Sequence, residues 1–307
     1  MAATGTSVEL DGHLITLTNL DKPLYPNGFT KAEVIQHYLA VADVMLPHLA
    51  RRCVTRVRFP DGSMGPSFYE KNAPGGSPDW LRTFTVDASS TLIAYPLIDS
   101  AAALVLMAQY AALELHVPQW QAPTTAVEPF ALGDDTLADM LMVDLDPGEG
   151  TTMVDTAEAA LIVATRLAVD GLLPHVKTTG SKGLQVQAAI SPTGARRVVS
   201  YLRRIGAELM ASHPNRFLLT QNRAARTGLT LIDVLQNLAV RNTIAPYSLR
   251  GRQEPSVSTP VTWDEVAAAA AGAPLVFTAA DLPPRLAAHG DLAADLLTPT
   301  AASLPDE

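Results

Sequence analysis

The feature that most constrains this chain is the run LMVDLDPGEG at 141–150, where apolar residues carry two aspartates before the chain breaks at Pro147 and Gly148. Side chains alternate between the faces of a strand, so Asp144 and Asp146 point the same way while Leu145 faces the core. Burying two like charges is costly unless a cation neutralises them, and hard divalent cations prefer oxygen ligands. The run therefore predicts a strand that ends at a Mg²⁺ or Mn²⁺ site. The alternative is that the aspartates only cap the following turn and helix.

Composition sets the class of protein. The 307 residues are 48% hydrophobic and 17% charged, which is enough to build a substantial core in one large domain or two lobes. The single cysteine, Cys53, excludes an intramolecular disulfide framework and a Cys-based zinc cluster. The N-terminus lacks a basic stretch followed by an apolar one, and the longest apolar run, 101–108, is too short to cross a bilayer. We expect a cytoplasmic protein.

Charge is distributed unevenly along the chain. The net charge is −9, yet residues 253–307 hold eight acidic residues and one arginine, which leaves residues 1–252 nearly neutral. Within 1–252 the basic residues are clustered, as at Arg51, Arg52, Arg56 and Arg58. Such clusters indicate either grooves for nucleic acid or solvated faces. We expect a catalytic domain of two lobes at 1–252, and an acidic, Ala- and Pro-rich segment at 253–307 that packs on this core or trails from it.

Helical and strand patterns alternate without a regular βαβ period, which predicts an α+β fold with mixed or antiparallel sheets flanked by helices. Helices are expected at 31–50, from 99 to about 115, at 152–169 and around 198–209. Strands are expected at 54–59, 68–71, 92–96 and 229–233, and two more within 176–190, around the stretch 178–183.

A third aspartate, Asp233, ends the strand-like run at 229–233 much as Asp146 ends its own. Three carboxylates at two strand ends can hold two metal ions about 3.5–4 Å apart, the arrangement used in phosphoryl transfer. One ion lowers the pKa of an attacking hydroxyl and the other stabilises the leaving pyrophosphate. A lone aspartate at a strand end is more often structural.

Other candidate residues each have two interpretations. The stretch TGSKG at 179–183 predicts either a phosphate cradle or a Gly-rich hairpin turn. Arg250 could meet a triphosphate or only solvate, and His116 could be catalytic or a hydrogen-bonded core residue. Phe68 and Tyr69 could stack on a base, although core packing explains at least one of them as well.

Several motifs together resemble the polymerase module of bacterial DNA ligase D, a member of the archaeo-eukaryotic primase superfamily. The motifs are LDKPLYP at 20–26, FYEKN at 68–72, ELHVPQW at 114–120, DLDPGEG at 144–150, TGSKGL at 179–184, LIDVLQN at 231–237 and IAPYSLR at 244–250. The resemblance implies a primase-like catalytic core. It also implies a template-directed nucleotidyltransferase that fills gaps and extends ends during non-homologous end joining, with a preference for ribonucleotides and use of Mn²⁺ or Mg²⁺.

The resemblance also assigns roles to residues. Asp144, Asp146 and Asp233 match the catalytic metal ligands. The nucleotide-binding positions are His116, Thr179, Ser181, Lys182, Gln185, Arg226 and Arg250. The DNA-binding positions are Lys22 and Lys31, which match lysines that hold a 5′-phosphate across a gap, together with Arg58, Phe68, Tyr69 and Lys71. The implied partners are gapped DNA, 5′-phosphate ends or 3′ overhangs, ribonucleoside and deoxyribonucleoside triphosphates, a Ku-like protein and a separate DNA ligase.

The chain departs from the family pattern in two places. The family usually reads Ser-Gly-x-Lys-Gly-Leu-His where this chain has Thr179 and Gln185. Threonine keeps the hydroxyl, whereas glutamine can hydrogen-bond but cannot carry charge. The hairpin at 86–92, where the family tends to place basic residues that help two ends meet, has no basic residue here. Two alternatives therefore stay open: a DNA-end-binding module with weakened catalysis, and a gap filler of short-patch excision repair.

Overall fold

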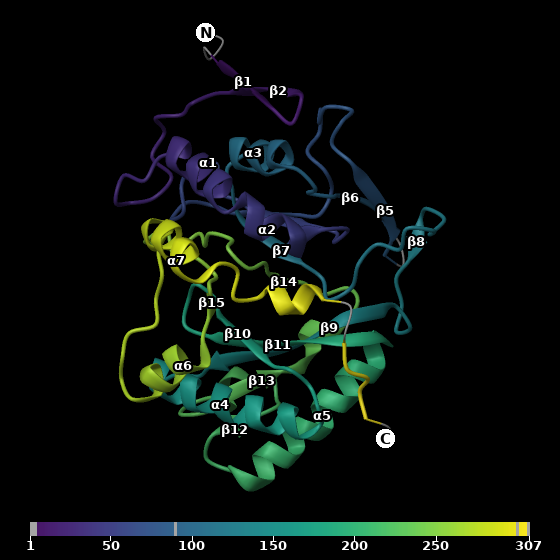
Figure 1. Cartoon of the computed structure of the whole chain (residues 1–307), viewed down its shortest axis with the longest axis vertical. Coiled ribbons are helices and arrows are strands. Elements are labelled where there is room, and N and C mark those ends of the chain that lie inside the picture. The colour runs from purple at the N-terminus through teal and green to yellow at the C-terminus, as the bar shows by residue number, and fades with distance from the viewer. Residues whose placement is uncertain (1–4, 89–90, 299–300, 306–307) are drawn as a thin grey trace.

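The computed structural model describes residues 5–88, 91–298 and 301–305, and in it two lobes lie one above the other (Figure 1). The lower lobe is built on a six-stranded sheet and the upper lobe on a four-stranded sheet. Most strand pairs are antiparallel, with parallel pairing only between β12 and β13 and between β5 and β8 among the described strands. The expected α+β arrangement with mixed sheets is confirmed.

The six-stranded sheet positions the residues around Asp144. In order across the sheet its strands are β12 (Phe217–Leu218), β13 (Thr230–Asp233), β9 (Leu137–Pro147), β11 (Leu184–Gly194), β10 (His175–Thr178) and β15 (Pro260–Val261). The helices of this lobe are α4 (Met153–Val169), α5 (Ala195–Ser212) and α6 (Trp263–Ala270). Leu141, Val143 and Leu145 of β9 pack with buried residues of α4 and α5 in one core cluster. The alternate residues of β9, Asp144 and Asp146, consequently face away from this core. The upper lobe lies on the side of the sheet opposite α4 and α5 (Figure 1).

The upper lobe carries the second sheet. Its strands, in order, are β14 (Thr243–Ile244), β7 (Ala112–Val117), β3 (Thr55–Arg58) and β4 (Phe68–Glu70). The helices α1 (Lys31–Ala40), α2 (Ala42–Leu49) and α3 (Ala101–Gln109) share its core. Two smaller sheets complete the lobe, a hairpin of β1 (Thr6–Leu10) and β2 (His13–Leu17), and a sheet of β6 (Leu92–Pro96), β5 (Thr83–Asp87) and β8 (Phe130–Ala131).

Two expected helices differ from those in the structure. The helix expected at 31–50 divides at Val41 into α1 and α2, and Pro47 lies inside α2. The helix expected to reach Leu115 ends at Gln109, so the prediction was wrong for the strand β7. Ala111 takes a positive φ of 58° at the break, and β7 then pairs with β3 and β14. Pairing on both sides outweighs the helix propensity of an Ala- and Leu-rich segment.

The C-terminal segment is joined to both lobes. β15 extends the six-stranded sheet, and Asp291 accepts hydrogen bonds from Tyr247 Oη (2.5 Å) and His48 Nε2 (2.8 Å). Further helices of the described chain are α7 (Leu282–His289) and the 3-10 helices η1 (Arg223–Ala225), η2 (Val234–Asn237), η3 (Ala279–Asp281) and η4 (Ala294–Leu297). The expected division at 252/253 stays a prediction, and its ends at 1–4 and 306–307 lie outside the described residues.

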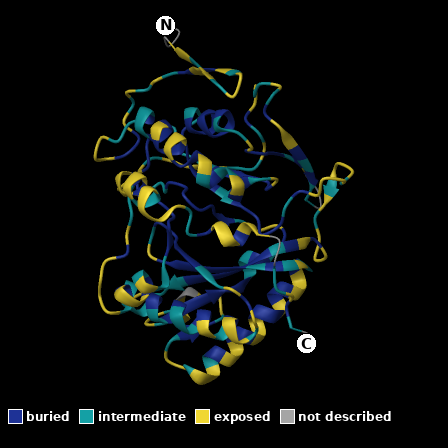
Figure 2. Cartoon of the chain, in the orientation of Figure 1, coloured by how far each residue is buried: buried dark blue, intermediate teal, exposed yellow. Residues whose placement is uncertain are grey.

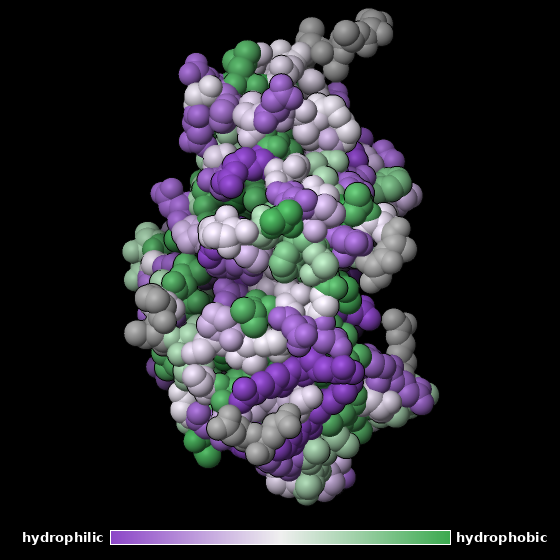
Figure 3. Space-filling model, turned by 90° about the vertical axis from the view of Figure 1, so that its right-hand side faces the viewer, coloured by the Kyte–Doolittle hydropathy of each residue, from purple (hydrophilic) through white to green (hydrophobic). Residues whose placement is uncertain are grey.

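The exposure of residues to solvent follows the arrangement of helices around the sheets. The outer faces of the helices are exposed while the strands of the six-stranded sheet are mostly buried (Figure 2). On the face drawn in Figure 3, hydrophilic side chains cover much of the lower lobe.

None of the helices in the described part of the chain has the length and hydropathy of a membrane-crossing segment. Ser89 and Ser90 of the expected 86–92 hairpin lie outside the described residues.

Candidate active site

A single cross-strand row of polar residues forms the floor of the site. Asp233 of β13 pairs with Asp144 of β9, Asp144 with Gln185 of β11, and Gln185 with Lys177 of β10. Residues opposite one another in antiparallel strands point to the same face, so these four side chains lie side by side. Asp146 lies two residues further along β9 on that face. The register thus brings together three aspartates from segments about 90 residues apart in the sequence.

Asp144 and Asp146 are held in a protonation-prone state by burial and by like charge. Burial, and then the neighbouring charge of Asp146, raises the pKa of Asp144 to about 7. Burial and the charge of Asp233 raise the pKa of Asp146, although Arg226 and Arg250 act in the opposite direction. A buried carboxylate with a raised pKa is short of positive charge nearby. Oxygen donors in this state suit a hard divalent cation.

The third carboxylate is engaged by the protein itself. Asp233 Oδ1 accepts from Gln221 Nε2 and from the backbone N–H of Leu235, both at 3.0 Å, and Oδ2 accepts from Gln236 Nε2 at 2.9 Å. Asp233 therefore caps η2, as the structural interpretation of a strand-end aspartate predicts. Across the described residues, no group of three His, Cys, Asp or Glu side chains is arranged to hold a metal ion as it stands.

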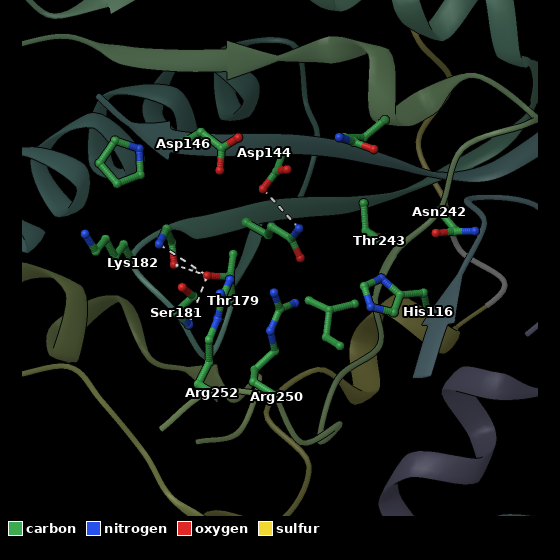
Figure 4. Close-up of a pocket in the computed structure, with 15 residues that line it drawn as sticks. His116, Asp144, Asp146, Thr179, Ser181, Lys182, Asn242, Thr243, Arg250 and Arg252 are labelled. Atoms are coloured by element: carbon green, nitrogen blue, oxygen red, sulfur yellow. Dashed lines mark hydrogen bonds between the residues drawn. The ribbon is translucent and has the colours of Figure 1, made fainter. Parts of the chain in front are cut away.

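The row opens into a cavity of about 370 Å³ between the lobes (Figure 4). Most of the expected nucleotide-binding residues line it together with two aspartates, namely His116, Asp144, Asp146, Thr179, Ser181, Lys182, Gln185 and Arg250. Sequence reasoning did not single out four further lining residues, Gln236, Asn242, Thr243 and Arg252. In Figure 4 Arg250 and Arg252 lie opposite the two aspartates, so the cavity has an acidic wall and a basic wall.

The turn at 179–183 is organised by one hydroxyl. Thr179 Oγ1 donates to the carbonyl of Gly183 and accepts from the backbone N–H groups of Ser181 (3.3 Å) and Gly183 (3.2 Å). These N–H groups are therefore satisfied within the turn, which joins β10 to β11 as the hairpin interpretation predicts. Gly180, at a φ of 67°, leaves no room for a Cβ beside Arg250 Cγ. Lys182 is exposed and lines the cavity, where it places an ammonium group at the end of a flexible side chain.

Glu114, which the sequence did not single out, holds two of the expected nucleotide-binding residues. Its carboxylate accepts from His116 Nε2 at 2.9 Å, pairs with Arg250 Nε at 3.4 Å and accepts from the Gly251 N–H at 2.9 Å. Burial alone would raise the pKa of Glu114, but the His116 hydrogen bond and the Arg250 charge outweigh it and lower the pKa to about 2. Burial lowers the pKa of His116. The sequence around Glu114 shows only a polar residue within a strand, so it does not indicate that Glu114 pairs with Arg250.

Arg226 lies outside the lining of this cavity. Its Nη2 donates to the carbonyl and to the side-chain oxygen of Gln221, the residue that also contacts Asp233. Its charge lowers the pKa of Asp146. Arg226 is thus tied to the carboxylates through Gln221, while its contact with a nucleotide stays a prediction.

Three of the expected DNA-binding residues, Arg58, Tyr69 and Lys71, line a second cavity of about 470 Å³ beside β4. Tyr69 and Phe68 are 55% and 49% exposed, so neither is a core residue. Tyr69 Oη donates to Asn242 Oδ1, and its ring packs edge-on near His116. Because Asn242 lines the first cavity, Tyr69 connects the two.

The two lysines expected to hold a 5′-phosphate differ in exposure. Lys31 is 6% exposed, and its Nζ donates to the carbonyls of Thr18 and Gln109, both at 3.1 Å. Burial, and then the charges of Lys22 and Arg58, lower the pKa of Lys31. Lys22 is more open and lies 3.5 Å from Asp61. The structure thus places three cations, Lys22, Lys31 and Arg58, near one another.

Comparison with known proteins identifies the family. The family described as LigD, primase-polymerase domain, matches residues 30–293. The chain belongs to this family. It is 41% identical over 255 residues to the multifunctional non-homologous end joining protein LigD of Mycolicibacterium smegmatis, which covers 82% of this chain and 32% of that protein. It is 28% identical over 255 residues to the bifunctional LigD of Bacillus subtilis, which covers 82% of this chain and 39% of that protein.

A solved structure agrees. The polymerase domain of Mycobacterium tuberculosis Ligase D, determined in complex with DNA, superposes with a TM-score of 0.86 at 40% identity, over 92% of this chain and 98% of that one. The primase-like fold and the family expected from the motifs are confirmed. The chain spans about a third of the length of the curated relatives that it matches.

Proposed function

We propose that this chain is a template-directed nucleotidyltransferase that adds nucleotides across DNA gaps and at DNA ends in non-homologous end joining. One observation carries the proposal, a single cavity in which Asp144 and Asp146 lie opposite Arg250 and Arg252 (Figure 4). Nucleotidyl transfer brings a divalent cation and a triphosphate together, and the two walls match these two charges. Membership of the LigD primase-polymerase domain family supports the same reaction.

The proposed cofactor is Mn²⁺ or Mg²⁺, held by Asp144, Asp146 and Asp233. When bound, a pair of such ions lowers the pKa of the attacking 3′-hydroxyl and stabilises the leaving pyrophosphate. Two of the three donors on Asp233 are the side-chain amides of Gln221 and Gln236. Rotation of these two amides would leave Asp233 with only the backbone N–H of Leu235 as a donor, without disturbing the backbone of β13.

The protein's own residues orient the nucleotide. Arg250, held from behind by Glu114, presents a fixed charge to the triphosphate, and Lys182 adds a mobile one from the turn. Glu114 accepts the Nε2 proton of His116, which leaves Nδ1 as the ring atom free to meet the nucleotide. A ribonucleotide preference is part of the proposal and rests on the family resemblance.

The proposed path for DNA runs along β4. Tyr69 lies where the two cavities meet, which suits an aromatic ring that stacks on a template base. Lys22, Lys31 and Arg58 form the proposed site for the 5′-phosphate across a gap. The M. tuberculosis domain was solved in complex with DNA, which supports a nucleic-acid path on this chain. A Ku-like protein and a separate ligase are the proposed partners.

The test is primer extension on a gapped duplex that carries a 5′-phosphate, with Mn²⁺ or Mg²⁺ and each kind of nucleotide. We expect extension that stops when the metal is chelated and that is lost in Asp146→Asn. The matched control is Asp264→Asn, the same change at an exposed carboxylate on α6. Extension that survives in Asp146→Asn contradicts the metal assignment.

The same assay addresses the alternatives. No extension with any metal, together with intact binding of the gapped duplex, would favour a DNA-end-binding module. Efficient extension of one-nucleotide gaps with none at paired 3′ overhangs would favour excision repair over end joining.

A further inference from the structure

Lys177 is a charged residue in the floor of the site to which none of the roles above refers. It lies on β10 at the end of the row Asp233–Asp144–Gln185–Lys177, and it is 1% exposed. A lysine is almost never buried to this degree unless its ammonium group has specific partners. Its surroundings therefore indicate what it does.

The ammonium group has two hydrogen-bond acceptors, and both are side chains. Lys177 Nζ donates to Gln185 Oε1 at 2.5 Å and to Ser258 Oγ at 2.8 Å. Ser258 in turn donates to the Thr178 carbonyl at 2.9 Å, which anchors it to β10. Ser258 therefore fixes the position of Lys177 Nζ, and the same nitrogen donates a second hydrogen bond to Gln185.

The other end of the Gln185 amide meets a carboxylate. Gln185 Nε2 donates to Asp144 Oδ1 at 3.0 Å. An ammonium group can only donate and a carboxylate can only accept, so the charged form of either neighbour turns the amide oxygen to Lys177 and the amide nitrogen to Asp144. The opposite orientation would leave both contacts repulsive inside a buried site.

We propose that Lys177 is a positioning residue that locks the amide of Gln185 in one orientation. The oxygen of Gln185 is held by the lysine, so the second Nε2–H is the group that this side chain can offer to the cavity. Gln185 then meets a ligand as a hydrogen-bond donor, which favours a phosphate oxygen. This consequence for the nucleotide rests on the proposed function, whereas the orientation of the amide does not.

The pair also explains the glutamine at a position where the family usually has histidine. A doubly protonated imidazole would offer Lys177 no acceptor. Glutamine accepts from Lys177 and donates to Asp144 without any change of protonation.

Solution NMR of the metal-free protein tests the orientation. The side-chain amide signals of Gln185, assigned by their loss in Gln185→Leu, should exchange slowly with water. In Lys177→Met the amide can rotate, and we expect about ten-fold faster exchange, the equivalent of one charge-assisted hydrogen bond. Ser258→Ala is the matched control, because it removes the other partner of Lys177 and leaves the Gln185 contact in place.

Equal exchange rates in Lys177→Met and the parent, or equal acceleration in Ser258→Ala, would overturn the proposal. Should Lys177→Met fail to fold, Lys177→Gln supplies a polar side chain that can donate or accept, and the same acceleration is expected. Thermal unfolding midpoints establish which variants are folded.

Nucleotide kinetics then test the consequence. We expect Lys177→Met to raise the KM for a ribonucleotide about ten-fold with little change in kcat. In the double variant, adding Lys177→Met to Gln185→Leu should not raise KM any further, because the lysine acts through Gln185. Additive losses would contradict this route. A parent protein without nucleotidyl transfer would refute the proposed function, while the NMR result would still decide the role of Lys177.

Discussion

The two sheets that face each other across the site surround their carboxylates in opposite ways. In the four-stranded sheet, Glu114 lies between His116 and Arg250, and Glu70 lies between Arg56 and Arg58. In the six-stranded sheet, Asp144 and Asp146 crowd together and the donor on Asp144 is a neutral amide. The first set is neutralised by the protein. The second set has no such paired cation, and the raised pKa values of Asp144 and Asp146 fit the metal-binding role proposed for them.

The largest expected effect comes from removing one of the crowded charges. Asp144→Asn should lower primer extension by about a thousand-fold or more, since it removes a ligand of the proposed cations. It should also raise the thermal unfolding midpoint of the metal-free protein by about 2–4 °C at neutral pH, because a like-charge repulsion is relieved. Calorimetry beside the extension assay checks both. A lower midpoint would show that Asp144 is already neutralised within the protein.

Replacing a carboxylate by an amide on the other side of the cavity, at Glu114, should lower the stability of the protein instead of raising it. Glu114→Gln leaves Arg250 buried without its counter-ion, so we expect a loss of about 2–3 kcal/mol in the free energy of unfolding at neutral pH. We also expect a nucleotide KM raised about ten-fold, since His116 and Arg250 lose their anchor. Urea unfolding and extension kinetics measure these, with Glu265→Gln, which unpairs Arg285 outside the lining of the cavity, as the control.

The pH dependence of that stability has a definite sign. The folded-state pKa of Glu114 is about 2, below its ordinary value of 4.5. Its contribution to stability is therefore complete above about pH 4.5 and is lost as the pH falls towards 2. Glu114→Gln should flatten the unfolding free energy of the parent across that window. A parallel pair of curves would mean that Glu114 titrates normally.

A smaller effect is expected at the turn that carries Lys182. Thr179→Val removes the hydroxyl that holds the N–H groups of Ser181 and Gly183, and should weaken nucleotide binding about five- to ten-fold. Thr179→Ser keeps the hydroxyl and should stay within two-fold of the parent. Nucleotide titration of both variants measures this. Similar losses in both would assign the effect to the methyl group and its packing.

The smallest effect is expected at Lys22 of the proposed 5′-phosphate site. Lys22→Ala should weaken binding to a gapped duplex a few-fold and reduce the slope of log affinity against log salt by about one. The loss should appear only when the gap carries a 5′-phosphate. Fluorescence anisotropy across salt concentrations, with and without the phosphate, measures it. Equal losses on both duplexes would reduce Lys22 to general surface charge.

Local pattern predicted the parts of the site that depend on short segments. The alternation in 141–146 gave the face shared by Asp144 and Asp146, and the glycines of 179–183 gave the turn. The break at Ala111 could not be predicted, because a non-glycine residue with positive φ leaves no compositional mark.

Residues whose role depends on the register or the packing of strands were missed. Lys177 meets Gln185 only through the register of β10 and β11, and Glu114 meets Arg250 only because β7 is a strand. Both are polar residues in short apolar segments, which sequence reasoning assigns to an exposed face. The motifs supplied the family and the list of candidate residues, while the charge balance among them needed the packed structure.

The position of β14 has a consequence for synthesis. This strand, at 243–244, pairs with β7 at 116–117. One edge of the upper-lobe sheet is therefore completed by residues that are synthesised more than a hundred positions after β7. At roughly 5–20 residues per second, translation leaves that edge of β7 open for about 6–25 s. During this interval the exposed edge is available to other strands, so a chaperone that covers it should raise the yield of folded protein. Slowing translation between residues 117 and 243 should lower the yield.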